Sequence, residues 1–319
     1  MIRLVRRIAL CGLVPSLLVV LGMVADAASA QEPRARQGLL SLEDARLFYE
    51  VVGSGEDPII IVHGGPGLDH SYLQPGLDVL AVRHTLVYYD QRATGRSTSE
   101  LTPEAINLEA FVEDIDAVRQ ALGYDRINLL THSFGALIGL EYAARHPENL
   151  RSLILLNPVE PGTQFQEDTS ERQRRARTEA DSVELAELTA TEGFAARDAA
   201  TLSQVFRVVF RQSLRDRARI SELNLDLMQA TAKNGQDVAQ LLGGGIGPVD
   251  WWDRLPEIEA PTLVLHGRYD VVPVSMSSAL AEVFPAGSLA VLDSGHFGYL
   301  EDPDGLLAVV SGFIAGLDR

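Results

Sequence analysis

Three side chains that could act together as a nucleophile, an acid and a base stand where apolar runs of this sequence end. Ser133, Asp270 and His296 each follow a short run of strand-forming residues. After Ser133 the pattern changes at once to that of a helix, residues 135–145. A serine at a sharp strand-to-helix turn presents its hydroxyl above the end of a sheet, and serine, acid, histidine is a known chain order of catalytic triads. The pattern therefore predicts nucleophilic catalysis by Ser133.

Hydrolysis of an ester or an amide would suit these residue types. It needs a nucleophile, a base beside it, a group that orients the base, and donors for the developing oxyanion. His296 would take the proton of Ser133 during attack, and Asp270 would hold the other ring nitrogen and stabilise the imidazolium. Asp293 and Asp302 lie near His296 in the sequence and remain alternatives for the acid.

Two backbone amides are candidates for the oxyanion donors. The N–H of Phe134 would lie at the N-terminus of the helix that follows the serine, where unpaired amides favour negative charge. The segment His63–Gly67 (His-Gly-Gly-Pro-Gly) follows the apolar run 58–62, and its glycines let the backbone approach a substrate. We expect Gly65 to supply the second donor, with Gly64 as the next candidate.

The elements around these residues alternate between strand-like and helix-like patterns. Continuous apolar runs at 58–62 and 84–89 are typical of strands that are covered on both faces. Residues 108–122 carry an apolar stripe at helical spacing, and we also expect a helix over 70–82. Such alternation builds an α/β fold with a mostly parallel, doubly wound sheet, whose ligands bind at the carboxyl ends of the strands. The candidate catalytic residues all fall at that edge.

The alternation stops in the middle of the chain. The interrupted part is rich in Ala, Glu, Arg and Leu at helical spacing. We therefore predict a helical cap over residues 159–252, inserted into a core of residues 31–158 and 253–319.

Residues 1–30 have the features of a cleavable export signal. Arginines precede the apolar run 8–24, and Ala28-Ser-Ala30 offers the small residues that a signal peptidase reads. We expect the mature chain to begin at Gln31 and the protein to be periplasmic or secreted. An uncleaved anchor is the alternative, because the apolar run approaches spanning length. The only cysteine is Cys11, so the mature chain has no thiol nucleophile or thiolate metal site.

The composition and charge of the chain argue against several classes of binding partner. The 319 residues carry a net charge of −17, and such an acidic surface repels nucleic acid and anionic membranes. Several arginines lie close together around residue 174. We interpret them as one solvent-exposed helix face with ion pairs within the helix, because Glu171 and Arg175 are four residues apart. The glycine-rich run 241–247 lacks the lysine of a phosphate-binding loop. We expect no cofactor, no metal, no nucleic-acid partner and no stable membrane association after cleavage, and a small molecule or short peptide as substrate; the oligomeric state is open.

Two motifs carry a resemblance to a known family. His63–Gly67 and Asp90–Ser97 (Asp-Gln-Arg-Ala-Thr-Gly-Arg-Ser) resemble the paired motifs of prolyl aminopeptidases (proline iminopeptidases) and close α/β-hydrolase relatives, and Ser-Gly-His-Phe around His296 is similar too. The resemblance spans residues 40–158 and 255–313 and implies an α/β-hydrolase fold. It implies these site residues: Ser133, Asp270, His296, Gly65 and Phe134. We interpret Asp90–Ser97 as structural, its charged groups bonding to neighbouring loops; contact with the substrate is the alternative.

The chain also departs from that family. Its turn Thr131–Gly135 reads Thr-His-Ser-Phe-Gly where the family usually has Gly-Gly-Ser-Trp-Gly, and this form also occurs in esterases and carbon–carbon bond hydrolases. The family's cap usually carries an Ala-Arg-Ile-Glu-Asn stretch whose acids hold the substrate's amine. Ala218–Glu222 (Ala-Arg-Ile-Ser-Glu) corresponds only loosely, which makes Glu222 a candidate amine-binding residue or simply a solvated glutamate.

The leading interpretation is an exported serine hydrolase that releases N-terminal residues from peptides. A small-molecule carboxylesterase or lactonase is the alternative. A catalytically silent ligand-binding protein is the least favoured, because binding needs no complete triad. The sequence leaves open the leaving group and the choice between amide and ester.

Overall fold

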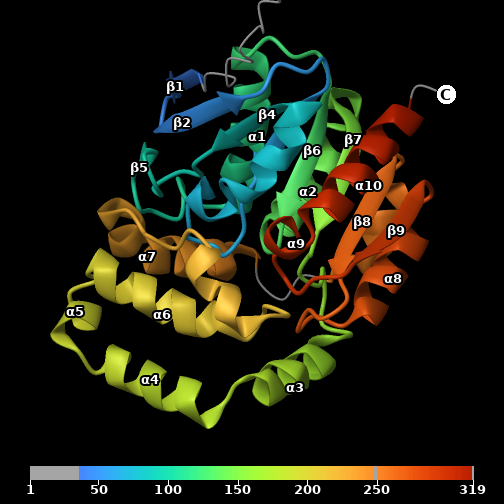
Figure 1. Cartoon of the computed structure of the whole chain (residues 1–319). Coiled ribbons are helices and arrows are strands. Elements are labelled where there is room, and N and C mark those ends of the chain that lie inside the picture. The colour runs from blue at the N-terminus through green and yellow to red at the C-terminus, as the bar shows by residue number, and fades with distance from the viewer. Residues whose placement is uncertain (1–35, 247–249, 318–319) are drawn as a thin grey trace, which may run out of the picture. The chain divides into compact units, whose positions relative to one another are not determined.

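A nine-stranded sheet forms the centre of the part of the chain that the computed structural model describes, residues 36–246 and 250–317 (Figure 1). The predicted signal peptide, residues 1–30, lies outside the described residues. The strand order is β1-β2-β4-β3-β6-β7-β8-β9, with β5 paired to β2; β1, β2 and β5 pair antiparallel and the others parallel. The strands are β1 (Arg36–Ser41), β2 (Ala45–Val52), β3 (Pro58–Val62), β4 (Thr85–Tyr89), β5 (Thr98–Ser99), β6 (Ile127–His132), β7 (Leu150–Leu156), β8 (Thr262–Gly267) and β9 (Gly287–Leu292).

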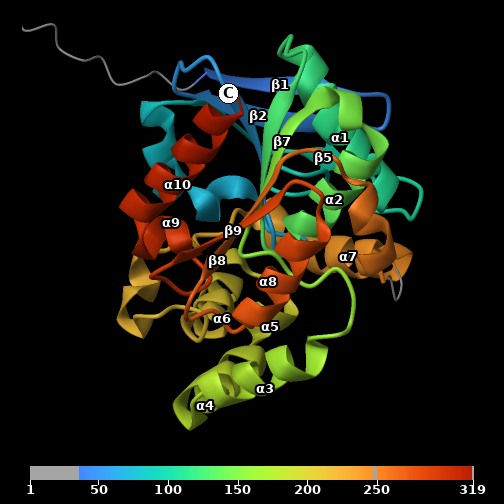
Figure 2. The ribbon, with the colours of Figure 1, turned by 90° about the vertical axis from the view of Figure 1, so that its right-hand side faces the viewer.

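Helices cover both faces of this sheet, so its central strands are buried on each side (Figure 2). The core on one face holds side chains of α1 (Leu108–Ala121), α2 (Gly135–Arg145) and α8 (Val274–Val283). The core on the other face holds side chains of η2 (Gly76–Val82) and α10 (Pro303–Gly316), beside the short α9 (Gly298–Glu301). Successive strand residues alternate between the two cores, which explains the continuous apolar runs. The prediction of a mostly parallel, doubly wound sheet is confirmed.

One predicted element is wrong. Residues 70–82 form two 3₁₀ segments, η1 (His70–Leu73) and η2, instead of one helix. Pro75 separates them: proline has no N–H to continue a helix, and it disfavours helical backbone at the residue before it. Gln74 is accordingly extended, with φ −101° and ψ 149°.

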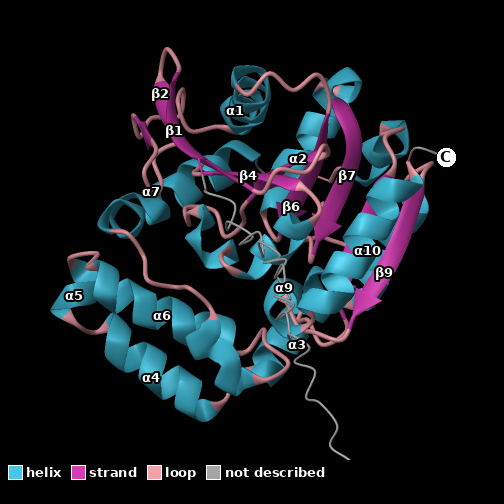
Figure 3. Cartoon of the chain, turned by 45° about the horizontal axis from the view of Figure 1, so that its top comes forward, coloured by secondary structure: helices cyan, strands magenta, loops and turns pink. Residues whose placement is uncertain are grey.

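The segment between β7 and β8, where the sequence predicts a cap, is built of helices and loops (Figure 3). Its elements are α3 (Gln166–Ala176), α4 (Glu179–Thr189), α5 (Glu192–Ala195), α6 (Ala199–Arg211), η4 (Arg217–Glu222), α7 (Gln229–Ile246) and η5 (Trp252–Glu257). Helix α7 meets the core backbone to backbone. A Cβ atom added at Gly67 would lie 2.0 Å from the carbonyl oxygen of Gly235 on α7, so neither position has room for a side chain. Among the described residues, no helix is long and apolar enough to cross a membrane.

Candidate active site

Ser133 occupies the turn between β6 and α2, as predicted. Its φ of 55° lies in the left-handed region, which is unfavourable for a residue with a side chain. Hydrogen bonds hold it there: its N–H donates to the carbonyl of Leu156 (3.1 Å), and its own carbonyl accepts from Ala136 (3.0 Å) and Val159 (3.3 Å). The end of β7 and the start of α2 thus fix the backbone of the turn.

The loop of residues 63–67, called here the oxyanion loop, lies against this turn. A Cβ atom added at Gly135, the first residue of α2, would lie 2.6 Å from the carbonyl oxygen of Val62 and 2.7 Å from that of His63. A Cβ atom added at Gly64 would lie 2.8 Å from Cβ of Ser133. The start of α2 can therefore approach the end of β3 only because its first residue has no side chain.

The amides near Ser133 differ in their hydrogen bonds. Gly64 donates its N–H to the hydroxyl oxygen of Tyr72 (2.8 Å), so this amide is already engaged. The N–H groups of Gly65 and Phe134 donate no hydrogen bond to any residue that the structure describes. This difference favours Gly65 over Gly64 as the oxyanion donor.

Asp270 and His296 are brought together from the loops after β8 and β9. Nδ1 of His296 lies 2.7 Å from Oδ2 of Asp270, whose carboxylate is buried. The same oxygen accepts from the side-chain amide of Asn157 (2.7 Å), and Oδ1 accepts from the N–H of Val272 (3.2 Å). Burial alone would raise the pKa of Asp270, but His296 and these hydrogen bonds outweigh it and lower the pKa below its ordinary value.

His132, the last residue of β6 and the neighbour of Ser133, packs against His296. The ring of His132 lies 4.9 Å from the ring of His296, centroid to centroid. In the described part of the chain no hydrogen bond joins the Ser133 hydroxyl directly to His296. Catalytic hydrogen bonds often tighten only when substrate binds, so the lack of this bond is no argument against proton transfer between the two residues.

The two alternative acids have other partners. Asp302 is the N-cap of α10 and accepts the N–H of Gly305 (3.1 Å). Asp293 is exposed and forms an ion pair with Arg215. Neither carboxylate bonds to His296 in the described residues, which favours Asp270.

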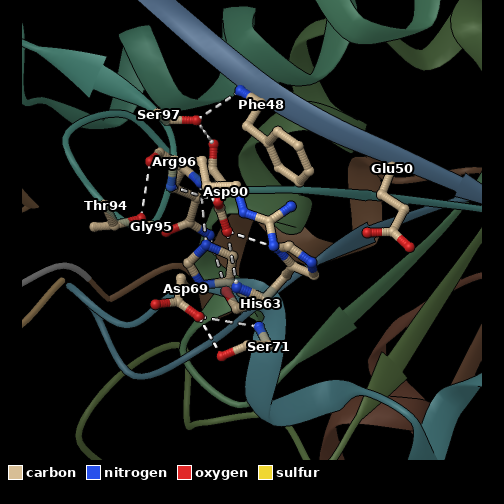
Figure 4. A network of polar contacts seen from close by, with 12 residues as sticks. Phe48, Glu50, His63, Asp69, Ser71, Asp90, Thr94, Gly95, Arg96 and Ser97 are labelled. Atoms are coloured by element: carbon tan, nitrogen blue, oxygen red, sulfur yellow. Dashed lines mark hydrogen bonds and ion pairs between the residues drawn. The ribbon is translucent and has the colours of Figure 1, made fainter. Parts of the chain in front are cut away.

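The segment Asp90–Ser97 lies beside His63 of the oxyanion loop (Figure 4). Oδ1 of Asp90 accepts from Nδ1 of His70 (2.6 Å), and Oδ2 accepts from the N–H of Arg96 (2.7 Å). Gln91 donates its N–H to Nε2 of His63 (3.1 Å) and its side-chain amide to the His63 carbonyl (2.9 Å). The predicted bonding of this motif to neighbouring loops is confirmed.

Sequence reasoning missed three further residues. Tyr72 and His132 bond to each other (2.8 Å), and Asn157 holds the carboxylate of Asp270. Asn157 carried a signal, because it directly follows a strand at the same edge of the sheet as Ser133. The pairing of Tyr72 with His132 had none, because 60 residues separate them.

Glu222 lies apart from these residues. It ends η4 with a half-exposed side chain, and its carboxylate bonds to the guanidinium of Arg219 at 2.7 and 3.0 Å. This hydrogen-bonded cation lowers the pKa of Glu222. Its charge is thus already compensated by a neighbour on its own segment.

A cavity of about 250 Å³ lies between the oxyanion loop and the cap. Pro66 and Gly67 line it from the loop, and apolar side chains line it from the cap, among them Phe194, Leu202, Phe206 and Ala232. Within the described residues, no group of three or more His, Cys, Asp or Glu side chains is placed to hold a metal ion.

Comparison with known proteins matches residues 57–303 to the family model of the alpha/beta hydrolase fold. The chain is 24% identical to a proline iminopeptidase of Heyndrickxia coagulans over 87% of this chain and 98% of that protein. It is 32% identical to a putative carbamate hydrolase of Rhizobium rhizogenes over 74% of this chain and 84% of that protein. The crystal structure of a proline iminopeptidase from Mycobacterium smegmatis superposes with a TM-score of 0.65 at 25% identity, over 89% of this chain and 99% of that one.

Proposed function

Because this chain belongs to the alpha/beta hydrolase fold family, we propose that it is an exported serine hydrolase that releases N-terminal residues from short peptides. The observation that carries the proposal is the buried Asp270–His296 pair, together with a strained serine turn and two amides that have no hydrogen-bond partner among the described residues. The similarity to proline iminopeptidases and the motifs His63–Gly67 and Asp90–Ser97 support the substrate class.

The proposed reaction begins with attack of the Ser133 oxygen on the substrate carbonyl carbon. The serine proton passes to Nε2 of His296, because Asp270 keeps the proton on Nδ1. The carbonyl oxygen becomes an oxyanion and accepts hydrogen bonds from the N–H groups of Gly65 and Phe134. When the intermediate collapses, the scissile bond breaks and His296 returns its proton to the leaving amine. Water then attacks the acyl-serine with the same base, which releases the acid and restores the hydroxyl of Ser133.

A fluorophosphonate probe tests the nucleophile. The probe should label the mature protein at Ser133, and Ser133→Ala should abolish labelling and lower kcat roughly 10⁴- to 10⁶-fold, the range for loss of a triad member. Ser288→Ala, which removes a hydroxyl at the start of β9, is the matched control and should keep both the labelling and the kcat of the wild type. A fully active Ser133→Ala enzyme would overturn the proposal.

Small-molecule ester hydrolysis is the second candidate. The turn sequence Thr131–Gly135, the existing partner of Glu222 and the similarity to a putative carbamate hydrolase favour it. An aminopeptidase must compensate the substrate's ammonium group, because an unpaired buried charge costs several kcal/mol. Proline p-nitroanilide and its N-acetyl form separate the two. An aminopeptidase should cleave proline p-nitroanilide and leave the N-acetyl form intact. An esterase or lactonase should cleave short p-nitrophenyl esters efficiently and cleave neither p-nitroanilide.

Export rests on the sequence of residues 1–30. The proposed cleavage after Ala30 leaves Gln31 as the first residue. N-terminal sequencing or the intact mass of exported material should show this start, and exported protein that retains Met1 would favour an anchor.

A further inference from the structure

A continuous chain of buried hydrogen bonds connects the oxyanion loop to His296. Gly64 donates its N–H to the Tyr72 hydroxyl (2.8 Å), and that hydroxyl lies 2.8 Å from Nδ1 of His132. Nε2 of His132 lies 3.0 Å from the backbone carbonyl oxygen of His296. The Tyr72 and His132 side chains are both buried.

The direction of each hydrogen bond follows from the partners. The carbonyl of His296 can only accept, so Nε2 of His132 carries the hydrogen. Burial, together with repulsion by His296, lowers the pKa of His132 to about 3, so the ring is neutral and its Nδ1 is a bare acceptor. The Tyr72 hydroxyl therefore donates to Nδ1, while its oxygen accepts from Gly64. Each hydrogen in the chain has one acceptor, and none is shared.

We propose that Tyr72 and His132 are positioning residues that set the oxyanion loop and the backbone of His296 in one fixed arrangement. This inference rests on the proposed function of Ser133 and His296. By holding the Gly64 amide, Tyr72 keeps it from competing for the substrate oxygen and leaves the Gly65 amide as the loop's donor. His132 connects Tyr72 to the backbone of His296, the proposed base.

His296 itself shows why its backbone needs this anchor. Its N–H donates to the carbonyl of Ser213 in the loop after α6 (2.7 Å), and its ring is held by Asp270. The His132 contact fixes the remaining backbone group, the carbonyl. The base thus has one support from the cap, one from the acid and one from the strand that carries the nucleophile. A misplacement of about 1 Å can cost roughly a hundredfold in rate, so the last support bears on turnover.

The test is Tyr72→Phe, which removes the hydroxyl that accepts from Gly64 and donates to His132. We expect kcat to fall roughly tenfold or more, with KM changed less than about twofold, because the loss falls on the transition state. The second-order rate of Ser133 labelling by fluorophosphonate should fall in parallel. Tyr88→Phe is the matched control: its buried hydroxyl donates to Asp78 (2.8 Å), so it loses a similar bond outside this chain and should keep its kcat.

A second variant separates coupling from simple loss of packing. His132→Asn keeps an acceptor near the Tyr72 hydroxyl but loses the donor to His296, and it should lower kcat by itself. If the two residues act as one chain, the double variant should be little worse than the worse single variant. Wild-type kcat in folded Tyr72→Phe, or effects that multiply in the double variant, would overturn the inference. Absence of Ser133 labelling in the wild type would instead overturn the proposed function itself.

Discussion

The core and the cap of this protein use charged side chains in different ways. In the core, Arg92 binds Asp114 through two hydrogen bonds (2.7 and 2.8 Å), with only 3% and 1% of the side chains exposed. In the cap, Arg207 pairs with Asp226 at 31% and 84% exposure. Opposite charges in water attract weakly, whereas a buried charge without its partner is costly. A buried pair such as Arg92–Asp114 is therefore costly to break, whereas an exposed pair such as Arg207–Asp226 contributes little.

Asp181 is an exception among the described residues of the cap, and it connects three elements of the cap. Asp181 is 3% exposed and forms a capping box with Thr178, the N-cap of α4, while its carboxylate accepts from Arg211 and Arg217 (3.2 and 2.6 Å). These bonds join α4 to α6 and η4. Burial would raise the pKa of Asp181, but the hydrogen bond from the N–H of Thr178 and the guanidinium of Arg217 outweigh it and lower the pKa to about 2. The difference between core and cap is thus a difference in burial, and substitutions on either side can test it.

The largest effect is expected at the buried pair of the candidate site. Asp270→Asn should lower kcat roughly 10⁴-fold, because the amide no longer holds His296 in the tautomer with Nε2 free. Asp293→Asn removes an exposed carboxylate that is much nearer to His296 in the sequence than Asp270 is, and it should leave kcat unchanged. Steady-state kinetics on the two purified variants checks this, and equal activities would show that Asp270 is not the acid.

The next effect concerns stability. Asp114→Asn breaks a buried, doubly hydrogen-bonded pair and should lower the free energy of unfolding by about 1–3 kcal/mol, while Arg92 keeps its bonds to Asp44 and to the carbonyl of Ala105. Arg207→Gln breaks an exposed cap pair and should change it by only about 0–1 kcal/mol. Urea unfolding followed by circular dichroism measures both. Similar losses in the two variants would remove the distinction between core and cap.

The pH dependence of stability should come from core histidines. Burial lowers the pKa of His63 to about 4 and that of His132 to about 3, whereas an unfolded histidine titrates near 6.5. Below about pH 6.5 the unfolded chain binds more protons, so stability should fall as the pH decreases toward 4. His70 acts in the opposite sense, because Asp90 outweighs burial and raises the pKa of its ring.

His132→Asn measures this contribution. It should reduce the slope of unfolding free energy against pH by about 1.4 kcal/mol per pH unit between roughly pH 4 and 6, the value for one proton. Urea titrations at several pH values give the slope. An unchanged slope would mean that His132 is not held neutral in the fold.

The smallest effect is expected in the cap. Glu222→Gln should change kcat/KM less than about twofold, because Arg219 already pairs with this half-exposed carboxylate. A rise in KM of roughly tenfold or more for free-amine amides, without a change for esters, would instead identify Glu222 as the amine-binding residue.

The sequence was most informative where one local rule decides the structure. The continuous apolar run of β3 and the start of α2 after Ser133 match the predicted boundaries, because burial on both faces and a strand-to-helix turn leave direct patterns. Strand β1 was missed, because most of its residues are exposed at the edge of the sheet and carry little apolar signal. The prediction of one helix over 70–82 was wrong because Pro75 interrupts it. The apolar pattern of this segment drew attention away from the proline.

The candidate site divides in the same way. Ser133, Asp270 and His296 each follow a strand, so their place at one edge of the sheet could be predicted from topology. The hydrogen bonds of Tyr72 and His132 could not, because they depend on side-chain directions in a folded core. The choice between the Gly64 and Gly65 amides likewise needed the position of one hydroxyl.

The contact between Gly67 and Gly235 has a consequence for redesign. Where the oxyanion loop crosses α7, each backbone occupies the space that a side chain of the other would need. A cap grafted from a related enzyme can seat in this position only if its crossing helix also presents a residue without a side chain. Replacement caps chosen for substrate range alone would tilt away from the loop, so a library of chimaeras should hold this glycine constant and vary the rest.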